Sequence, residues 1–256
     1  MSEDGWAMVD GVLSPVGQAT VPVTDLGLLR GLSVFETLSL PRGDLDEHLH
    51  RLEASCAATG LPPADRQVLR AEVHKVVDAV GAEAQVRITL TGSGRRLVVA
   101  SAATAGRRHA PVRCVRGPHV DDPFLPGFVK HGSRMGWEVA VAKAGVDDVL
   151  RVRDGRFTEG TRCGIVAVVD GVIVTAPHDG TILASTTVTR LLGHAQSLGL
   201  SVRREGPWAE GGWDALYIAS STRSLAPVVV LDGQPLAGWC PVGRSLAEAD
   251  DRWAAP

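Results

Sequence analysis

The chain has 256 residues, of which 45% are hydrophobic and 21% charged, and its formal net charge at neutral pH is -3. This length allows one large domain or two smaller ones that share a core. The slightly acidic balance, with a pI near 6.2, argues against a nucleic-acid or anionic-membrane partner, because both require a concentrated basic surface.

Cysteine usage and apolar run length bear on the cellular compartment. The four cysteines form no CxxC pair, which is too sparse for a disulfide framework or a zinc site and suits a reducing cytoplasm. They are Cys56, Cys114, Cys163 and Cys240. Residues 1–10 lack an apolar segment, so no signal peptide is expected, and no apolar run approaches the roughly 20 residues that span a bilayer. We expect a soluble cytoplasmic protein with no membrane partner.

The first half of the chain predicts strands around two helices. Val34 to Leu40 alternates polar and apolar residues, as in a strand with one buried face. Helices are expected from about Asp46 to Gly60 and from about Ala64 to Val80. Helical spacing assigns their inward positions to Leu49, Leu52, Cys56, Val68, Leu69, Val73, Val76, Val77 and Val80. Further strands are expected at 85–91, 96–102 and 112–115, after a short hairpin at 8–13.

The second half predicts a central hairpin. Residues 165–169 and 172–174 are apolar at consecutive positions, so both faces of each strand are covered and the hairpin belongs in the middle of a sheet. Asp170-Gly171 supplies the positive φ angles of a two-residue turn. Helices are expected at 135–144, 187–198 and 242–255, and strands at 148–152, 201–204, 215–219 and 227–231.

Together these elements predict an α+β protein with mixed, mainly antiparallel sheets and helices packed outside them. The loose, proline- and glycine-containing stretch 117–127 predicts a linker. We therefore expect a smaller α+β domain over residues 1–116 and a larger domain over residues 128–256.

Two charged residues are candidates for chemistry. Lys130 follows Phe128-Val129, so we expect it to end an apolar strand; taken alone, it is a surface lysine. A desolvated, deprotonated amine could instead form a Schiff base with an aldehyde cofactor. Glu159 follows 29 residues later, and a glutamate before a glycine is by itself a turn residue.

Hydroxyl-rich segments form a second group of candidates. Thr186 and Thr187 precede the helical residues 188–198, where backbone N–H groups and the helix dipole favour an anion. Simple N-capping by threonine explains them equally well. A metal site is not expected, because His48 and His50 lie two apart on a predicted helix and point about 200° apart.

The order of lysine, helix, strand, glutamate, hairpin and hydroxyl-rich helix start, over about 25–236, resembles the class IV aminotransferases. These are the fold-type-IV pyridoxal-phosphate (PLP) enzymes. The resemblance implies a two-domain fold like that of D-amino-acid aminotransferase, PLP as the cofactor, a small-molecule amine as the substrate, and a homodimer.

The resemblance also implies a role for each candidate. Lys130 would bind PLP covalently, and Glu159 would contact the pyridine nitrogen and keep it protonated, which makes the ring a stronger electron sink. Thr37, within residues 30–37, matches a threonine proposed to assist the lyase reaction of this family. The residues that match its phosphate-binding positions are Arg51, Thr186, Thr187, Ser221 and Thr222.

Three departures from the family pattern are visible. Ser185 stands where the family has glycine, Cys163-Gly164 where it has Ser-Asn, and Leu32-Ser33 where it has Asp-Gly. They put the substrate in question and allow a specialised member.

The pattern Lys130-His131-x-x-Arg134 is most similar to the aminodeoxychorismate lyases. It implies release of pyruvate from 4-amino-4-deoxychorismate to give 4-aminobenzoate, the folate precursor. The second hypothesis is an aminotransferase of D- or branched-chain amino acids with a 2-oxo acid acceptor. The third is a homologue that binds PLP but has lost or altered catalysis, which the departures motivate.

Overall fold

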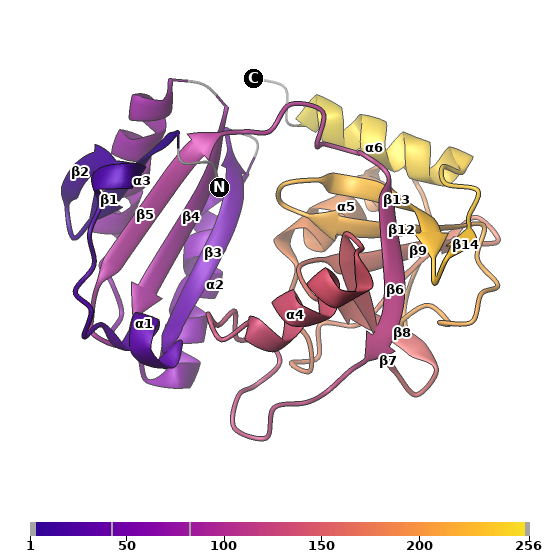
Figure 1. Cartoon of the computed structure of the whole chain (residues 1–256). Helices are drawn as coiled ribbons and strands as arrows, with labels where there is room; N and C mark the ends of the chain where they lie inside the picture. The colour runs from indigo at the N-terminus through magenta and orange to yellow at the C-terminus, as the bar shows by residue number, and fades with distance from the viewer. Residues whose placement is uncertain (1–3, 42, 82, 254–256) are drawn as a thin grey trace. The chain divides into compact units, whose positions relative to one another are not determined.

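The computed structural model describes residues 4–41, 43–81 and 83–253, and the chain divides into two compact units (Figure 1). The first unit runs to Ala105 and also includes Val129–Arg134. Of the described residues, the second unit comprises Gly106–Phe128 and 135–253. Within the described residues, neither unit contains a helix that is long and apolar enough to cross a membrane.

The first unit is built on an antiparallel sheet. Its elements are β1 (Gly5–Val9), β2 (Val12–Pro15), η1 (Val16–Gln18), α1 (Leu26–Arg30), β3 (Ser33–Leu40), α2 (Leu45–Thr59), α3 (Arg66–Val80), β4 (Ala84–Thr91) and β5 (Arg96–Ala102). Among the described residues the five strands have the order β2-β1-β5-β4-β3, and every pair is antiparallel. Helix α2 packs against β3, and α3 packs against β5 and β1.

Local chemistry fixes the ends of α2 and α3. The carboxylates of Asp44 and Asp65 accept backbone N–H groups of the first turn of each helix. Gly60 and Gly81 end the helices in the left-handed conformation that glycine adopts without strain. Both predicted helices are therefore confirmed, with starts displaced by one and two residues.

The predicted inward stripe of α3 is too wide. Leu69, Val73 and Val76 are buried, but Val68 is 41% exposed. A helix that packs on a sheet with one face buries a narrow stripe of side chains, and Val68 lies at the edge of the buried stripe of α3.

In the part of the chain that the structure describes, the second unit is a mixed sheet with three helices. Its elements are β6 (Val112–Pro118), α4 (Met135–Ala144), β7 (Asp148–Arg153), β8 (Arg156–Gly160), β9 (Gly164–Val169), β10 (Val172–Thr175), α5 (Thr186–Ser197), β11 (Val202–Arg204), β12 (Ala215–Ser220), β13 (Ser224–Leu231), β14 (Gln234–Pro235) and α6 (Pro241–Trp253). The strand order in the described residues is β11-β10-β9-β12-β13-β6-β7-β8, with β14 on β13. The pairs β10/β11, β13/β6 and β6/β7 are parallel and the others antiparallel. The predicted mixed, mainly antiparallel α+β architecture is confirmed.

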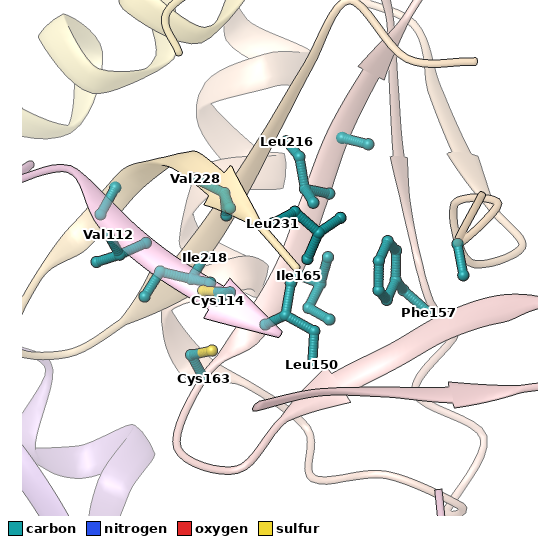
Figure 2. Close-up of a cluster of buried hydrophobic side chains, with 13 residues drawn as sticks. Val112, Cys114, Leu150, Phe157, Cys163, Ile165, Leu216, Ile218, Val228 and Leu231 are labelled. Atoms are coloured by element: carbon teal, nitrogen blue, oxygen red, sulfur yellow. The ribbon is translucent and has the colours of Figure 1, made fainter. Parts of the chain in front are cut away.

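The hairpin β9–β10 lies inside this sheet, as predicted, and both faces of β9 are covered. Ile165 and Ala167 join a cluster with residues of β7 and β8, so the sheet curls around that cluster (Figure 2). Val166 and Val168 join a second cluster with side chains of α5 and α6. Alternate residues of one strand therefore belong to two different cores, which explains its continuous apolar sequence.

The placement of β6 differs from the prediction. The expected strand 112–115 was assigned to the first domain, but β6 extends to Pro118 and pairs in parallel with β13 and β7 of the second unit. A parallel partner is distant in sequence, so no local pattern identifies it. The predicted terminal helix is confirmed as α6, and its expected last residues, 254–255, lie outside the described residues.

Close packing of α6 on the sheet depends on Gly243. A Cβ atom at this position would lie 2.0 Å from the hydroxyl oxygen of Tyr217 and 2.4 Å from its Cζ atom. Tyr217 is fully buried, and its hydroxyl accepts a hydrogen bond from Cys240 N at 3.0 Å. The tyrosine ring therefore cannot move aside easily.

We expect Gly243→Ala to lower the free energy of unfolding by about 1–3 kcal/mol, because α6 must shift away from the sheet. Urea denaturation measures this change. The matched control is Gly193→Ala in the interior of α5, where a Cβ atom meets nothing within 4 Å, so the change should stabilise by up to about 1 kcal/mol. Equal midpoints for both variants would contradict the packing argument.

Candidate active site

A buried carboxylate connects β3 with α2 in the first unit. Glu36 is 0% exposed. It accepts hydrogen bonds from Arg51 Nε at 2.8 Å and from Arg51 Nη2 at 2.6 Å, and His48 Nδ1 lies 2.7 Å from Glu36 Oε2. Burial alone would raise the pKa of Glu36, but Arg51 and His48 hold it at about 2. Glu36 is therefore an ionised group inside the fold.

This role of Glu36 was not predicted from the sequence. Alternation along β3 assigns Glu36 to the same face as Val34 and Leu38, which is the face that α2 covers. The available signal was the pair His48 and Arg51, three residues apart on one face of the following helix. Arg51 therefore lies beside a carboxylate and is not the solvated helix residue that its position alone suggests.

Lys130 lies along the edge of the first sheet. Its carbonyl oxygen accepts a hydrogen bond from Phe35 N at 2.9 Å, and Gly132 N donates to Ser33 O at 2.7 Å. Lys130 N donates to Ser55 Oγ of α2 at 3.2 Å. The prediction that Lys130 ends an apolar strand is wrong, since this segment makes only an isolated bridge to β3. Its position is set by main-chain bonds to a neighbouring strand.

Cationic side chains gather around the ring of Phe35. Arg87 Cζ lies 3.7 Å from the ring centroid, Lys130 Nζ 5.1 Å and Arg134 Cζ 5.8 Å. Thr37 lies on the same face of β3 as Phe35, directly opposite Arg87 in the register. The first unit therefore brings the predicted residues Lys130 and Thr37 to one side of β3, and Arg51 lies on the other side.

In the second unit, Glu159 lies in β8 and is 7% exposed. Arg151 of β7 forms an ion pair with Glu159 Oε1, and Arg151 Cζ lies 4.7 Å from the ring centroid of Trp137. Leu183 N, on the segment that leads into α5, donates to Glu159 Oε2 at 3.3 Å. The carboxylate is thus fixed next to the start of α5. Nothing in the sequence pattern identified Arg151.

The N-cap of α5 is Ser185, whose hydroxyl accepts a hydrogen bond from Val188 N at 3.2 Å. Capping by Thr186 or Thr187 is therefore excluded, since both lie in the first helical turn, and Thr187 is only 1% exposed. Gly164 of β9 lies against this turn. A Cβ atom there would be 2.5 Å from Val188 Cγ2 and 3.3 Å from Ser185 Cβ. Glycine at position 164 is therefore required mainly by its close contact with Val188.

The turn that carries Ser221 and Thr222 connects β12 and β13, and both residues are partly exposed.

A second turn, after Glu159, is fixed by the buried carboxylate of Asp148. This carboxylate accepts hydrogen bonds from Thr161 N and Thr161 Oγ1, both at 2.7 Å. No sequence pattern identified Asp148. The second unit therefore bonds Glu159 to Leu183, three residues before Thr186, and Asp148 fixes the turn between β8 and β9.

Comparisons with known proteins identify a family. The family profile described as "Amino-transferase class IV" matches residues 33–231. A bifunctional aminodeoxychorismate lyase / D-amino acid transaminase from Mycobacterium tuberculosis is 27% identical, with 95% of this chain and 96% of that protein covered. A D-alanine aminotransferase from Bacillus licheniformis is 22% identical, with 91% of each covered.

Solved structures show the same fold. A fold IV-transaminase, CpuTA1, from Curtobacterium pusillum has a TM-score of 0.84 and 27% identity, with 96% of this chain and 93% of that chain covered. A branched-chain aminotransferase from Thermoproteus uzoniensis has a TM-score of 0.86 and 22% identity, with 97% and 94% covered. These likenesses extend over both units.

The ionised Glu36 predicts a pH-dependent stability. Its pKa is lowered in the folded state from 4.5 to about 2, so its contribution is complete above the unfolded value and disappears as the pH falls through the folded value. We expect Glu36→Gln to cost about 3 kcal/mol at neutral pH, and the deficit to shrink as the pH approaches about 2. Urea denaturation over this pH range measures both effects.

The control is Glu53→Gln. Glu53 pairs with Arg66, and their side chains are 41% and 39% exposed, so less than about 1 kcal/mol should be lost. A Glu36→Gln deficit that stays constant with pH would show that Glu36 is not ionised in the fold.

Proposed function

The chain belongs to the class IV aminotransferases, PLP-dependent enzymes of fold type IV, and on that premise we propose that it is a 4-amino-4-deoxychorismate lyase. It would release pyruvate from its substrate and leave 4-aminobenzoate, the folate precursor. The observation that carries this proposal is the arrangement around Phe35, where Lys130, Arg134 and Thr37 share one side of β3. The bifunctional relative from M. tuberculosis supports it, since lyase activity is part of its name.

The residues present fit PLP. Glu159 offers a nearly buried carboxylate for a protonated ring nitrogen. The close approach of α5 to Gly164 leaves no room for a larger side chain there and brings the first turn of α5 against β9. A helix start with hydroxyl side chains is a natural phosphate site. When bound, PLP supplies an electron sink for the carbanion formed on the substrate.

The phosphate ligands proposed for this chain are the residues that match the phosphate-binding positions of the family. Thr186, Thr187 and the first-turn N–H groups of α5 would donate to the phosphate, together with Ser221 and Thr222. Arg51 would add a positive charge. A guanidinium carries five N–H donors, so its pair with Glu36 is compatible with donation to a phosphate, and that pair fixes its orientation.

Lys130 would bind the cofactor and then move protons. Its Nζ atom would take a proton from the substrate and return one to the product. Both roles require a deprotonated amine. Arg87 and Arg134 share the Phe35 ring with Lys130. Thr37 would assist proton transfer from the same side of β3.

Glu159 would accept a hydrogen bond from the protonated ring nitrogen and keep its proton in place. Arg151 favours the ionised carboxylate and limits its rotation. We include in the proposal a homodimer and a cytoplasmic location, which the family resemblance and the composition support.

A transaminase of D-amino acids is the second candidate. The D-alanine aminotransferases from Bacillus licheniformis and Listeria monocytogenes, 22% and 27% identical, support it. Half-reactions distinguish the two activities: a lyase releases pyruvate from 4-amino-4-deoxychorismate without an acceptor, whereas a transaminase converts its cofactor to the amine form with D-alanine. A homologue without catalysis would bind PLP and do neither.

We expect Lys130→Ala to lower kcat by at least about a thousandfold, because both the covalent attachment and the proton transfer depend on its amine. Pyruvate release measures kcat, and the absorption spectrum of the PLP-loaded protein reports the attachment. The control is Lys75→Ala on α3, an exposed lysine of the same unit, which should change neither. Retention of activity and spectrum in Lys130→Ala would refute the assignment of Lys130.

A further inference from the structure

A buried hydroxyl of α2 contacts the main chain of Lys130. Ser55 is 0% exposed and lies on the helix that also carries His48 and Arg51. Its Oγ atom accepts a hydrogen bond from Lys130 N at 3.2 Å. The chemistry proposed for Lys130 belongs to its amine, whereas this bond is made by its peptide group. The bond therefore fixes the main chain from which the amine extends.

The surroundings of Ser55 on the buried side of α2 are apolar. Leu49, Leu52 and Cys56 are each 1% exposed. Serine forms helices less readily than alanine, and a buried hydroxyl costs free energy unless it makes a hydrogen bond. Alanine would fill this position without either cost. A hydroxyl here is therefore explained by the bond that it makes to Lys130.

Lys130 is held from two directions. Its carbonyl oxygen accepts a hydrogen bond from Phe35 N of β3 at 2.9 Å, and Gly132 N donates to Ser33 O at 2.7 Å. Among the described residues, β3 is the edge strand of its sheet. Bonds along one strand edge alone would let the segment rotate about that edge. The bond to Ser55 of α2 opposes this rotation.

The helix that holds Lys130 also orients Arg51. Arg51 lies four residues before Ser55, so the two side chains lie on the same face of α2, with a rise of about 6 Å between them. Glu36 accepts two hydrogen bonds from Arg51. One rigid element therefore fixes both the cation proposed for the phosphate and the main chain of the proposed cofactor lysine.

We propose that Ser55 is a positioning residue for Lys130, whose hydroxyl fixes the main chain from which the amine reaches the cofactor and the substrate. The inference rests on the proposed function, in which this amine attaches the cofactor and then moves protons. The amine lies at the end of a flexible four-carbon stem and must return to the same place in every turnover. A misplacement of about 1 Å can lower a rate about a hundredfold.

Hydrogen exchange tests the contact without the cofactor. In the cofactor-free protein we expect Ser55→Ala to raise the exchange rate of the Lys130 amide at least about tenfold, measured by NMR, because its acceptor is removed. Ser55→Cys keeps the volume but offers only a weak acceptor, so it should exchange almost as fast. Ser55→Thr keeps the hydroxyl and should exchange like the wild type. Thermal melting verifies that each variant is folded.

The PLP-loaded protein gives two further readouts. Ser55→Ala should lower kcat at least about tenfold and leave KM within about twofold, because the amine is misplaced while the substrate contacts remain. The fraction of PLP joined to Lys130, trapped with borohydride and measured by mass spectrometry, should fall as well. Ser55→Thr should recover both quantities.

The matched control is Ser101→Ala. Ser101 is 3% exposed and lies on β5, which β4 separates from β3. This variant also removes a buried hydroxyl from the first unit. It should leave the exchange of the Lys130 amide, the attached fraction and kcat unchanged.

The outcomes separate this proposal from the proposed function. It is overturned if the Lys130 amide exchanges equally fast in the wild type and Ser55→Ala. It is also overturned if exchange accelerates while attachment and kcat stay the same, or if Ser101→Ala loses as much kcat as Ser55→Ala. If the wild type neither takes up PLP nor turns over an amine, the proposed function fails, and exchange in the cofactor-free protein still decides whether Ser55 holds Lys130.

Discussion

The carboxylate of Glu36 is the constraint on which the first unit depends. An ionised carboxylate inside a protein costs several kcal/mol unless cations and hydrogen-bond donors compensate it. Arg51 and His48 do so from successive turns of α2, and their bonds tie that helix to β3. Lys130 is held against the same strand through its main chain. A single buried ion pair therefore orders both the helix and the strand that carry the candidate residues.

The second unit also contains buried carboxylates that are compensated by arginines and hydrogen-bond donors. Asp250 of α6 is 0% exposed; it accepts Arg190 Nε of α5 at 2.6 Å and Arg108 Nη2 at 2.7 Å, and also accepts the hydroxyl of Ser224. Burial alone would raise the pKa of Asp250, but these partners hold it at about 2. The apolar clusters fix the strands, whereas Asp147, Asp148 and Asp250 fix the turns and helix starts where the candidate chemistry lies.

Much of this fold follows from local sequence. Alternation, consecutive apolar residues and capping residues predict most strands and helices, since each signal depends on near neighbours. Long-range partners were not predictable in this way, since β6 belongs to a parallel ladder whose partners are distant in sequence. The ion pair of Arg151 with Glu159 joins the neighbouring strands β7 and β8, but no sequence pattern identified it. For the candidate site, the family resemblance named Lys130 and Glu159, but it could not reveal Glu36 or the close contact of Gly164 with Val188.

The short segment Val129–Arg134 belongs to the first unit, although the residues on both sides of it belong to the second. Neither unit is therefore one uninterrupted stretch of chain. During synthesis on the ribosome, the last segment bound along β3 emerges only after β6 of the other unit has been made. The first unit therefore cannot be completed before part of the second unit has been synthesised. An amino-terminal fragment that ends at Ala105 would lack the segment that carries Lys130.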